Sequence, residues 1–394
     1  MTRVPLILYF WLVDDNPVQE AKLDGIRRYA AARRWVVDPV HESLSGPGRV
    51  QALLRERRPI GCIVESAGGK HYLPRRLFGD TPVVYLDMPA GLRSASASLR
   101  VSADDEAVAR AAFRELSAGR PASLAVVEYE FPICWSRRRS RTFRAAAVAE
   151  KRPCFVFSPR TGERREDRAD RLARWLATLP HPCGIFAVND ETGAEVASAR
   201  RAAGLSIPHD IALVGVDDSA RYCEASDPPF TSIRLDFERA GFLAARMLGE
   251  TASAGAAASF GPLLAIRRKS TGGRGRREKF VLDAVEIIRR EACDGLTARD
   301  LAARFRVSRN LFDLRFREAV GHSALDEILH VRVERACTLL AQTDTAIGAI
   351  PALCGFRCDR TLDALFRSRF GMSMRAWRTK HARPWRHFAI ENSL

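Results

Sequence analysis

The stretch Leu296-Thr-Ala-Arg-Asp-Leu-Ala-Ala-Arg-Phe-Arg-Val-Ser-Arg-Asn-Leu-Phe-Asp-Leu-Arg-Phe-Arg317 decides the fold of the last third of the chain. Its pattern predicts two short helices joined by a tight turn. Thr297 is expected to cap the first helix, which ends at Phe305, because Asp300 stands at the third helical position and completes a capping box. The chain then turns, and Ser308 is expected to cap the second helix. This arrangement is typical of a helix-turn-helix motif.

The second helix of this motif has an apolar face and a polar face. The apolar face is expected to bury Leu311, Phe312, Phe316 and the stem of Arg315. The residues predicted to contact DNA are Ser308 at the helix start and the outward-facing Arg309, Asn310, Asp313, Leu314 and Arg317. Arginine and asparagine side chains match the edges of guanine and adenine, and leucine suits a thymine methyl group. The helix therefore has the composition of a recognition helix.

A second unit of the same kind spans residues 346–371. A helix is expected to start at Asp359 and to run to Arg369, and to bury Leu362, Leu365 and Phe366. The residues predicted to contact DNA in this unit are Asp359, Arg360, Asp363 and Arg367, with Ala364 beside them. This face offers fewer hydrogen-bond donors than the first one.

A long amphipathic helix from Ala324 to about Gln342, capped by Ser323, joins the two units. About nineteen residues at about 1.5 Å each give a rod of roughly 28 Å. Successive major-groove faces on one side of a duplex are roughly 34 Å apart. The sequence therefore predicts a protein that reads double-stranded promoter or operator DNA at two places.

This segment resembles the AraC/XylS class of DNA-binding domains over residues 280–380. The matching landmarks are Leu301-Ala302, Val307-Ser308, Phe316, Gly321, Arg332, Ala336, Leu339-Leu340, Ile347, Gly355-Phe356, Phe366, Phe370-Gly371 and Trp377-Arg378. The resemblance implies an all-α double helix-turn-helix domain. One departure is Pro351, where the class usually has a small helix former. An interior proline costs a helix about 3 kcal/mol, so we expect a kinked second unit.

The positive charge of the chain is concentrated in this part. The 394 residues carry a formal net charge of +16, which favours a polyanionic partner. From Ile266 onward there are 26 Lys and Arg residues against 15 Asp and Glu, compared with 37 against 32 in the longer segment before it. The length also exceeds that of one hydrophobic core, so two or three domains are expected.

The nine cysteines have no disulfide framework. Most lie in apolar runs, which is typical of reduced, buried thiols in the cytosol. Cys354 and Cys358 have a spacing that two metal ligands can have, but no second cysteine pair and no histidine partner follow at a zinc-site spacing, so core thiols are favoured. Neither a metal nor a cofactor is expected. The apolar residues 4–13 are too few to span a bilayer, and a cytoplasmic protein without membrane contact is predicted.

The first 265 residues alternate short apolar runs with helical stretches. The predicted strands are residues 6–10, 60–64, 83–86, 124–127, 154–157, 184–188 and 211–216. The predicted helices are residues 19–33, 104–117, 137–150, 166–179 and 191–203. Continuous apolar strands indicate parallel sheets that are covered on both faces. We therefore predict an α/β fold with two doubly wound lobes.

Composition predicts a linker between the two parts. Residues 251–259 are small, and residues 267–277 mix glycine with positive charge, so neither stretch is expected to build a core. The predicted domains are residues 1–265 for the α/β part, 266–278 for a basic linker, 279–385 for DNA binding and 386–394 for a tail.

The segment Leu205-Ser-Ile-Pro-His-Asp-Ile-Ala-Leu-Val-Gly-Val-Asp-Asp218, preceded by Ile185-Phe-Ala-Val-Asn-Asp190, resembles the periplasmic-binding-protein-like sensors of lactose-repressor-type regulators. This resemblance implies two lobes that bind a sugar between them. Open α/β folds also bind ligands at the carboxyl ends of their strands on general grounds. Charged and amide groups that pair with hydroxyls, together with an aromatic surface, suit a sugar.

Polar residues at strand ends and helix starts are the predicted ligand contacts. Arg139 and Asp217 are the first choices, followed by Asp104, Asn189 and Asp190. The remaining predicted contacts are Asp218, Glu65, Asp14, and Trp11 and Trp135 as stacking surfaces. The alternative for the acidic residues is that they only cap helices.

The order of the parts, with the sensor first and the double DNA reader second, resembles that of xylose-operon regulators over nearly the whole chain. Residues 135–143 and 172–180 contribute to this resemblance. It implies a homodimeric transcription activator that responds to xylose or another pentose and contacts RNA polymerase.

Two other function classes stay open. A sugar-acting enzyme is one, but the chain has no Gly-x-Ser-x-Gly elbow, no His-Glu-x-x-His and no complete phosphate loop at residues 65–70. A non-specific architectural DNA-binding protein is the other, and it predicts similar affinity for random and promoter DNA at equal salt. Two recognition helices favour the sequence-specific regulator.

Overall fold

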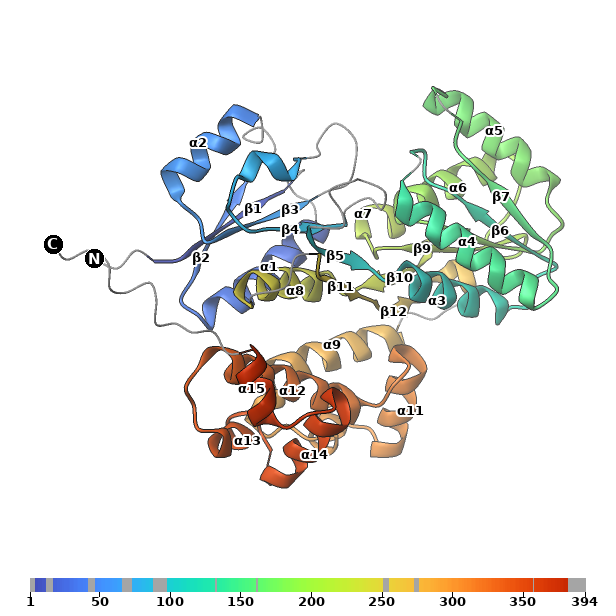
Figure 1. Ribbon diagram of the computed structural model, residues 1–394. Helices are drawn as coiled ribbons and strands as arrows, with labels where there is room; N and C mark the ends of the chain where they lie inside the picture. Colours follow the sequence, from blue (N-terminus) through green and yellow to red (C-terminus); the bar gives the residue numbers. More distant parts are fainter. Residues whose placement is uncertain are drawn as a thin grey trace. The chain divides into compact units, whose positions relative to one another are not determined.

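The computed structural model describes residues 4–11, 17–41, 47–65, 73–87, 98–131, 133–160, 162–250, 255–272, 276–356 and 358–381. The chain divides into two compact units, Met1–Gly275 and Arg276–Leu394. The first unit is an α/β structure with two sheets, and the second is helical (Figure 1). The predicted fold class is therefore confirmed.

Lobe 1 of the first unit is built on a sheet with the strand order β11-β5-β4-β3-β1-β2, in which the pairings are parallel. Its strands are β1 (Leu6–Phe10), β2 (Val36–Val40), β3 (Gly61–Glu65), β4 (Val83–Leu86), β5 (Leu99–Ala103) and β11 (Ala257–Phe260). Its helices are α1 (Pro17–Ala31), α2 (Pro47–Arg57), the 3-10 helix η3 (Arg75–Phe78) and α8 (Phe237–Gly249). Ile7, Leu8 and Ile63 are fully buried because helices cover both faces, which explains the continuous apolar strands.

Lobe 2 is built on a sheet with the order β12-β10-β9-β8-β6-β7, parallel except for the pairing of β10 with β12. Its strands are β6 (Ser123–Val127), β7 (Cys154–Phe157), β8 (Cys183–Ala187), β9 (Ile211–Val216), β10 (Thr231–Leu235) and β12 (Pro262–Ile266). Its helices are α3 (Asp105–Ser117), α4 (Cys134–Ala149), α5 (Arg165–Thr178), α6 (Asp190–Ala202), α7 (Ala220–Cys223) and the 3-10 helix η4 (Lys269–Thr271).

The described chain crosses between the lobes after β5, after β10 and after β11. Hydrogen bonds join these crossings. The backbone N–H of Asp104 donates to the Phe260 carbonyl at 2.7 Å, and that of Asp236 donates to the Gly261 carbonyl at 3.2 Å. Asp104 and Asp236 also cap the helices that follow them, α3 and α8. These crossing segments connect the two lobes, and backbone hydrogen bonds hold the segments next to one another.

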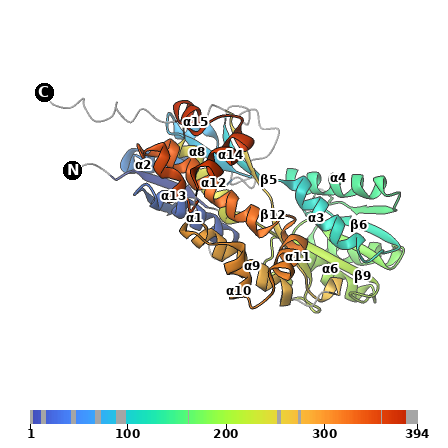
Figure 2. The ribbon, with the colours of Figure 1, turned by 90° about the horizontal axis from the view of Figure 1, so that it is seen from below.

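Helices α1 and α8 pack with their backbones in close contact (Figures 1 and 2). A Cβ atom at Gly25 would overlap the carbonyl oxygen of Glu238, and one at Gly241 would overlap the carbonyl oxygen of Lys22. Because only glycine allows this approach, the two positions fix α1 against lobe 1. The side chain of Lys22, on α1, is consequently buried.

The second unit consists of helices grouped around α12. They are α9 (Arg276–Glu291), the 3-10 helix η5 (Ala292–Asp294), α10 (Ala298–Arg304), α11 (Arg309–Val320), α12 (Ala324–Gln342), the 3-10 helix η6 (Ile347–Ala349), α13 (Ile350–Leu353), α14 (Asp359–Phe370) and α15 (Met374–His381). In Figure 2, α10 and α11 lie on one side of α12 and α13 to α15 on the other. Arg332 of α12 donates to the carbonyls of Ala292 and Leu296 at 2.8 and 2.9 Å, which ties α12 to the turn before α10.

The predicted caps of this unit are confirmed. Thr297 and Asp300 form a capping box at α10, and Ser323 and Asp326 form one at α12. The Ser308 hydroxyl accepts from the Leu311 backbone at 3.3 Å at the start of α11. One side chain differs from expectation, since Leu311, which was expected to be buried, is 37% exposed. It lies in the first turn of α11, whereas Phe312 one position later is fully buried.

Pro351 does not interrupt a helix. It lies in the first turn of α13, directly after η6, where a helix leaves backbone N–H groups without a partner in any case. The expected kink was therefore wrong, because the missing N–H removes no interior hydrogen bond. The side chain of Pro351 is buried.

The basic stretch expected to be a linker is partly folded into lobe 2. Ile266, Lys269 and Thr271 belong to β12 and η4 of lobe 2, and residues 257–260 of the preceding small-residue stretch form β11 in the sheet of lobe 1. Ser270 is fully buried. The composition was misleading because the positive charges here are paired with carboxylates of lobe 2, so the segment gains order from charge pairing and not from apolar burial.

The thiols also differ in part from expectation. Cys354 is buried, as expected for a core thiol, but Cys358 is exposed at the start of α14. In the described residues all cysteines are free, Cys354 and Cys358 included. None of the described helices has the length and apolar character that crossing a bilayer requires.

Candidate ligand site and DNA-binding face

Arg139 is a buried cation held in one orientation. It lies on α4 and is 4% exposed. Its Nε donates to Asp105 Oδ1 at 3.0 Å and its Nη1 donates to the Val188 carbonyl at 2.7 Å. The guanidinium carbon lies 4.9 Å from the centre of the Trp135 ring. These contacts fix the guanidinium at the carboxyl end of β8, where the fold class binds ligands.

Asp217 follows β9 and faces the same region. Its φ is 104°, which is unusual for a residue other than glycine, and its backbone N–H donates to the Ile233 carbonyl at 2.9 Å. Burial raises the pKa of Asp217 to about 6. Arg139 and Lys22 act to lower this pKa, and the carboxylates of Asp87 and Asp105 act to raise it. The charges of both lobes therefore meet around Asp217.

Lobe 1 contributes a chain of polar contacts centred on Lys22. Its Nζ donates to Glu65 Oε2 at 2.9 Å and to Asp87 Oδ2 at 3.1 Å. The hydroxyl of Tyr9 donates to Glu65 Oε1 at 2.6 Å. Burial alone would lower the pKa of Lys22, but the Glu65 and Asp87 carboxylates raise it above its ordinary value, so Lys22 is charged. Glu65, predicted as a ligand contact, is instead engaged by Tyr9 and Lys22 on both of its oxygens.

We call Lys22, Asp87, Asp105, Arg139 and Asp217 the interlobe cluster. Two are cations and three are carboxyls, and they come from α1, the end of β4, the start of α3, α4 and the end of β9. Carboxylates accept hydrogen bonds from hydroxyls, and a fixed guanidinium donates them. The cluster is therefore suited to a ligand with several hydroxyl groups and no net negative charge.

Three members of the interlobe cluster were missed by the sequence analysis. Asp87 directly follows β4, so the rule that selected Asp217 at the end of β9 would have found it. Asp105 stands next to the predicted Asp104, and only the helix start at Asp105 shows which of the two pairs with Arg139. Lys22 lies in an amphipathic helix, and nothing in the sequence marks it as buried.

Several predicted contacts have structural partners. Asp104 Oδ1 accepts from Ala107 N at 2.9 Å, and Asn189 Oδ1 accepts from Thr192 N at 3.0 Å, so both cap helices. Asp190 is buried and accepts from Ser219 N and Ser232 Oγ, both at 2.7 Å. Burial, with the nearby Asp217 carboxylate, raises the pKa of Asp190 to about 8.

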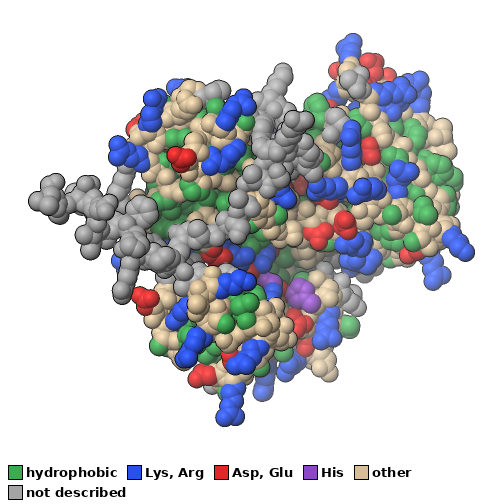
Figure 3. All heavy atoms as spheres, in the orientation of Figure 1, with side chains coloured by type: hydrophobic (Ala, Val, Ile, Leu, Met, Phe, Trp, Pro, Cys, Tyr) green, Lys and Arg blue, Asp and Glu red, His purple; other side chains and the backbone are tan. Residues whose placement is uncertain are grey.

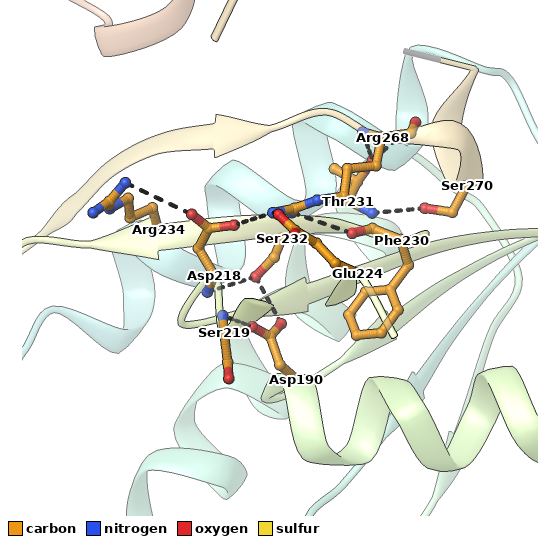
Figure 4. A network of polar contacts seen from close by, with 10 residues as sticks. All are labelled: Asp190, Asp218, Ser219, Glu224, Phe230, Thr231, Ser232, Arg234, Arg268 and Ser270. Carbon is orange, nitrogen blue, oxygen red and sulfur yellow. Dashed lines mark hydrogen bonds and ion pairs between the residues drawn. The ribbon is translucent and has the colours of Figure 1, made fainter. Parts of the chain in front are cut away.

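The remaining predicted contacts differ in their surroundings. Asp218 pairs with Arg268 at 2.8 Å and lies 3.8 Å from Arg234 (Figure 4). Trp11 is half-buried, and its indole Nε1 is buried without a hydrogen-bond partner among the described residues. Trp135 packs between Arg139 and Tyr129. Asp14 lies outside the described residues. Within the described ranges no three His, Cys, Asp or Glu side chains form a metal-binding group.

The face predicted to read DNA in the first helix-turn-helix is largely exposed. Arg309, Asn310 and Arg317 are exposed, and Leu314 is 55% exposed. Asp313 is half-buried and lies 3.7 Å from Arg309, a contact at the surface that a phosphate or base can replace at little cost. The first helix-turn-helix therefore presents two cations, an amide and an apolar side chain on one surface.

The second helix-turn-helix presents a face of mixed charge on α14. Asp359, Arg360, Ala364 and Arg367 are exposed, and Arg367 donates to Asp363 at 3.0 Å. Basic side chains project at the lower edge of the second unit in Figure 3, where α14 lies. Leu362 and Phe366 are buried, while Leu365, which was expected to be buried, is half-buried.

Comparisons with known proteins match both units. A periplasmic binding protein-like domain family matches residues 106–271, and a helix-turn-helix domain family matches residues 301–380. The xylose operon regulatory protein of Escherichia coli K12 is 25% identical over 250 residues, which cover 62% of this chain and 64% of that protein. The matched region thus spans less than two thirds of this curated relative.

Solved structures show the same fold. The xylose-binding transcription activator XylR has a TM-score of 0.57 at 20% identity, covering 97% of this chain and 100% of that one. The regulator CelR in complex with cellobiose has a TM-score of 0.55 at 21% identity and covers 68% of this chain and 85% of that one.

Proposed function

We propose that this chain, which joins a periplasmic binding protein-like domain to a helix-turn-helix domain as xylose-operon regulators do, is a transcriptional regulator controlled by a small sugar. The observation that carries the proposal is the interlobe cluster, where Arg139 and Asp217 of lobe 2 meet Lys22 and Asp87 of lobe 1. A ligand bound there contacts both lobes, so its binding energy depends on how they are arranged. Such a ligand shifts the conformational equilibrium of the sensor.

A sugar is the ligand class that the cluster favours. The carboxylates of Asp87, Asp105 and Asp217 accept from neighbouring hydroxyls, and Arg139 donates to a ring or hydroxyl oxygen. The partnerless Nε1 of Trp11 is a further donor. Because carboxyls outnumber cations in the interlobe cluster, an uncharged sugar is expected to bind better than a sugar acid or phosphate. The similar regulators named above bind xylose and cellobiose, and we propose xylose or another pentose as the effector.

DNA is the proposed partner of the second unit. Arg309, Asn310 and Leu314 on α11 would contact base edges, with Ser308, Asp313 and Arg317 beside them. On α14 the corresponding residues are Asp359, Arg360, Asp363 and Arg367. The exposure of both faces and the basic excess of this unit support the proposal. Two separate helix-turn-helix units favour promoter or operator DNA over random sequence as the target.

The remaining features of the proposal are a homodimer that activates transcription in the cytoplasm and contacts RNA polymerase. These features are supported by the similarity of the chain to a transcription activator of the same fold, which matches this chain over nearly its whole length. Light scattering with and without promoter DNA tests the dimer, and a reporter assay with and without sugar tests the sign of regulation.

A thermal-shift screen tests the effector. The purified chain is heated with D-xylose, L-arabinose, D-ribose, D-glucose, cellobiose, xylonate and xylose 5-phosphate. We expect at least one uncharged sugar to raise the melting temperature and the two anions to have no effect. Stabilisation by an anion alone would contradict the assignment of the cluster, and turnover of any sugar would indicate an enzyme.

A further inference from the structure

The segment that precedes the second unit is built into lobe 2 by polar contacts. Arg267 Nε donates to Glu115 Oε1 at 2.8 Å on α3. Ser270 is fully buried, and its hydroxyl donates to the Leu213 carbonyl at 2.6 Å and accepts from Thr231 N at 2.8 Å. Residues 267–271 are therefore a fixed part of the sensor and not a free tether.

The strongest of these contacts leads to the end of β9. Arg268 Nη2 donates to Asp218 Oδ1 at 2.8 Å, and the two side chains are 14% and 11% exposed (Figure 4). Arg268 also donates its backbone N–H to Thr231 Oγ1 at 2.9 Å. A largely buried ion pair of this kind leaves an unpaired charge if either side chain moves away, so it holds Arg268 to Asp218.

The same turn is tied to the start of α6. Asp218 N donates to Ser232 Oγ at 3.0 Å, and Ser232 Oγ donates to Asp190 Oδ1 at 2.7 Å. Asp190 Oδ2 accepts from Ser219 N at 2.7 Å. Figure 4 shows these side chains meeting between β9, β10 and α6. A shift of the turn is therefore shared by Asp190, by Asp218 and by Arg268, which Asp218 holds.

Asp217 and Asp218 are consecutive residues with different neighbours. The Asp217 carboxyl interacts with the interlobe cluster, through Arg139 and Lys22, whereas the Asp218 carboxyl interacts with Arg268 and Arg234. Both have positive φ, 104° and 56°. Non-glycine residues held in such conformations store backbone strain, and a change in contacts on one side of the turn can release it. The turn thus joins the ligand cluster to the segment before the second unit.

Few residues separate this segment from the second unit. Helix α9 begins at Arg276, four residues after Gly272. Four residues span at most about 14 Å when fully extended, so α9 begins within about 14 Å of Gly272.

We propose that the Asp218–Arg268 ion pair transmits occupancy of the interlobe cluster to the DNA-binding unit. Asp218 was predicted as a ligand contact, but its carboxyl pairs with Arg268 and Arg234 and not with the interlobe cluster. We therefore assign Asp218 and Arg268 as positioning residues and not as ligand or DNA contacts. The inference rests on the proposed function, since it concerns how the same sugar site controls DNA binding. Loss of the pair leaves both binding sites intact and removes the free-energy coupling between them.

The test compares two affinities in each variant of the full chain. Sugar affinity is followed by tryptophan fluorescence with D-xylose, L-arabinose, D-ribose and cellobiose as probes. Promoter DNA affinity is followed by fluorescence anisotropy with and without the sugar that has the largest effect. Coupling is the ratio of the two DNA dissociation constants. For Asp218→Asn and Arg268→Gln we expect this ratio to fall to near 1, with sugar affinity changed by less than about threefold, or about 0.65 kcal/mol.

The chain offers a matched control in the neighbouring pair. Arg267→Gln removes the Arg267–Glu115 pair, which has the same charge type in the same segment but leads to α3 and not to the turn. We expect it to keep the coupling of the unaltered chain. Arg268→Lys, which keeps the charge, is expected to keep part of it. The double exchange Asp218→Arg with Arg268→Asp is expected to restore part of the coupling lost by the single variants.

Each outcome is decisive. Full coupling in both Asp218→Asn and Arg268→Gln would overturn the inference, as would an equal loss in Arg267→Gln, because any damage to the segment would then suffice. If either single variant fails to fold, Arg268→Lys and the double exchange decide by the same ratio. If the unaltered chain binds no sugar and shows no coupling, the proposed function fails as well.

Discussion

Asp217 combines a strained backbone with a buried carboxyl among four charged side chains. Asparagine keeps the shape and tolerates positive φ, but its amide carries no charge. We expect Asp217→Asn to abolish the effect of sugar on promoter binding, while DNA affinity without sugar stays within about twofold of its original value, or about 0.4 kcal/mol. DNA titrations with and without D-xylose measure this. A retained sugar response would remove Asp217 from the site.

The raised pKa of Asp217 gives a pH-dependent cost in stability. A carboxyl whose pKa is higher in the folded chain favours the folded state at low pH, and this contribution is lost as pH rises from about 4 through about 6. Removing the carboxyl should therefore stabilise the unliganded protein mainly at neutral pH. We expect Asp217→Asn to raise the melting temperature more at pH 7.5 than at pH 5. An equal change at both pH values would show that the Asp217 charge is not destabilised by burial.

Ionisation of Asp217 should also govern ligand binding. At a pH above the Asp217 pKa of about 6, the carboxylate accepts hydrogen bonds from sugar hydroxyls. At a lower pH one of its oxygens is protonated. We expect sugar affinity of the unaltered chain to fall between pH 7.5 and pH 5. Isothermal titration at both values measures it, and an affinity that rises on acidification would contradict the assigned role.

Arg309 is exposed on the first recognition helix and is held by only a long contact to Asp313. We expect Arg309→Ala to weaken promoter binding by about 1–3 kcal/mol and to relax preference at one base step. Competition against promoter variants measures both effects. Arg299→Ala, which removes an exposed arginine from α10, is the matched control and should affect all sequences alike. A uniform loss for Arg309→Ala would make it a phosphate contact.

The ligand residues show how far sequence reasoning extends at this scale. Arg139 was selected because it was expected near a helix start, and Asp217 because it follows a strand, and they do lie in one cluster. Arg139 itself lies in the second turn of α4, which begins at Cys134. Asp104 was selected by the same rule, but a one-residue difference in where α3 begins leaves it as a cap and gives Asp105 to Arg139. The position of Lys22 depends on the α1–α8 contact, which brings together segments far apart in the chain.

Among the elements, strands covered on both faces were the easiest to predict. β1, β4 and β9 have the expected bounds because each is an unbroken apolar run. β7, an edge strand that is mostly not buried, also has the expected bounds. β2 was missed, since Asp38 and Pro39 interrupt its pattern; it lies at the sheet edge, where a proline costs no ladder bond. β11 was missed because a short strand of mostly small residues takes its structure from its neighbours. β12 was also missed, although Leu263, Leu264 and Ile266 make it apolar.

Pro351 offers a test at the level of one element. In the first turn of α13 its missing N–H leaves no acceptor unpaired inside a helix. We expect Pro351→Ala to change the free energy of unfolding by less than about 1 kcal/mol. The control Ser368→Pro places a proline inside α14 and should cost about 3 kcal/mol or more. Urea unfolding measures both, and a stabilisation of about 3 kcal/mol by Pro351→Ala would mean that Pro351 does strain the second reader.

For the whole molecule, composition indicated two parts, and the division between the two units, after Gly275, falls inside the predicted linker of residues 266–278. Arg267 and Arg268 were counted as linker charges available to DNA, yet they pair with Glu115 and Asp218 in the sensor. Charge patterns cannot show whether an arginine meets a phosphate or a carboxylate of its own chain, because the partner lies about 50 residues or more away in sequence. This pairing places the sensor's polar network directly before the DNA-binding unit.

Titration of promoter DNA with and without a pentose decides whether a sugar controls DNA binding by this chain. The unaltered chain is titrated onto its own promoter and onto random DNA at equal salt, alone and with D-xylose, L-arabinose or D-ribose. We expect preference for the promoter and a change in its dissociation constant of about 5–150-fold with at least one sugar. Equal affinity for both DNAs, or a promoter affinity that no sugar changes while tryptophan fluorescence also stays constant, would contradict it.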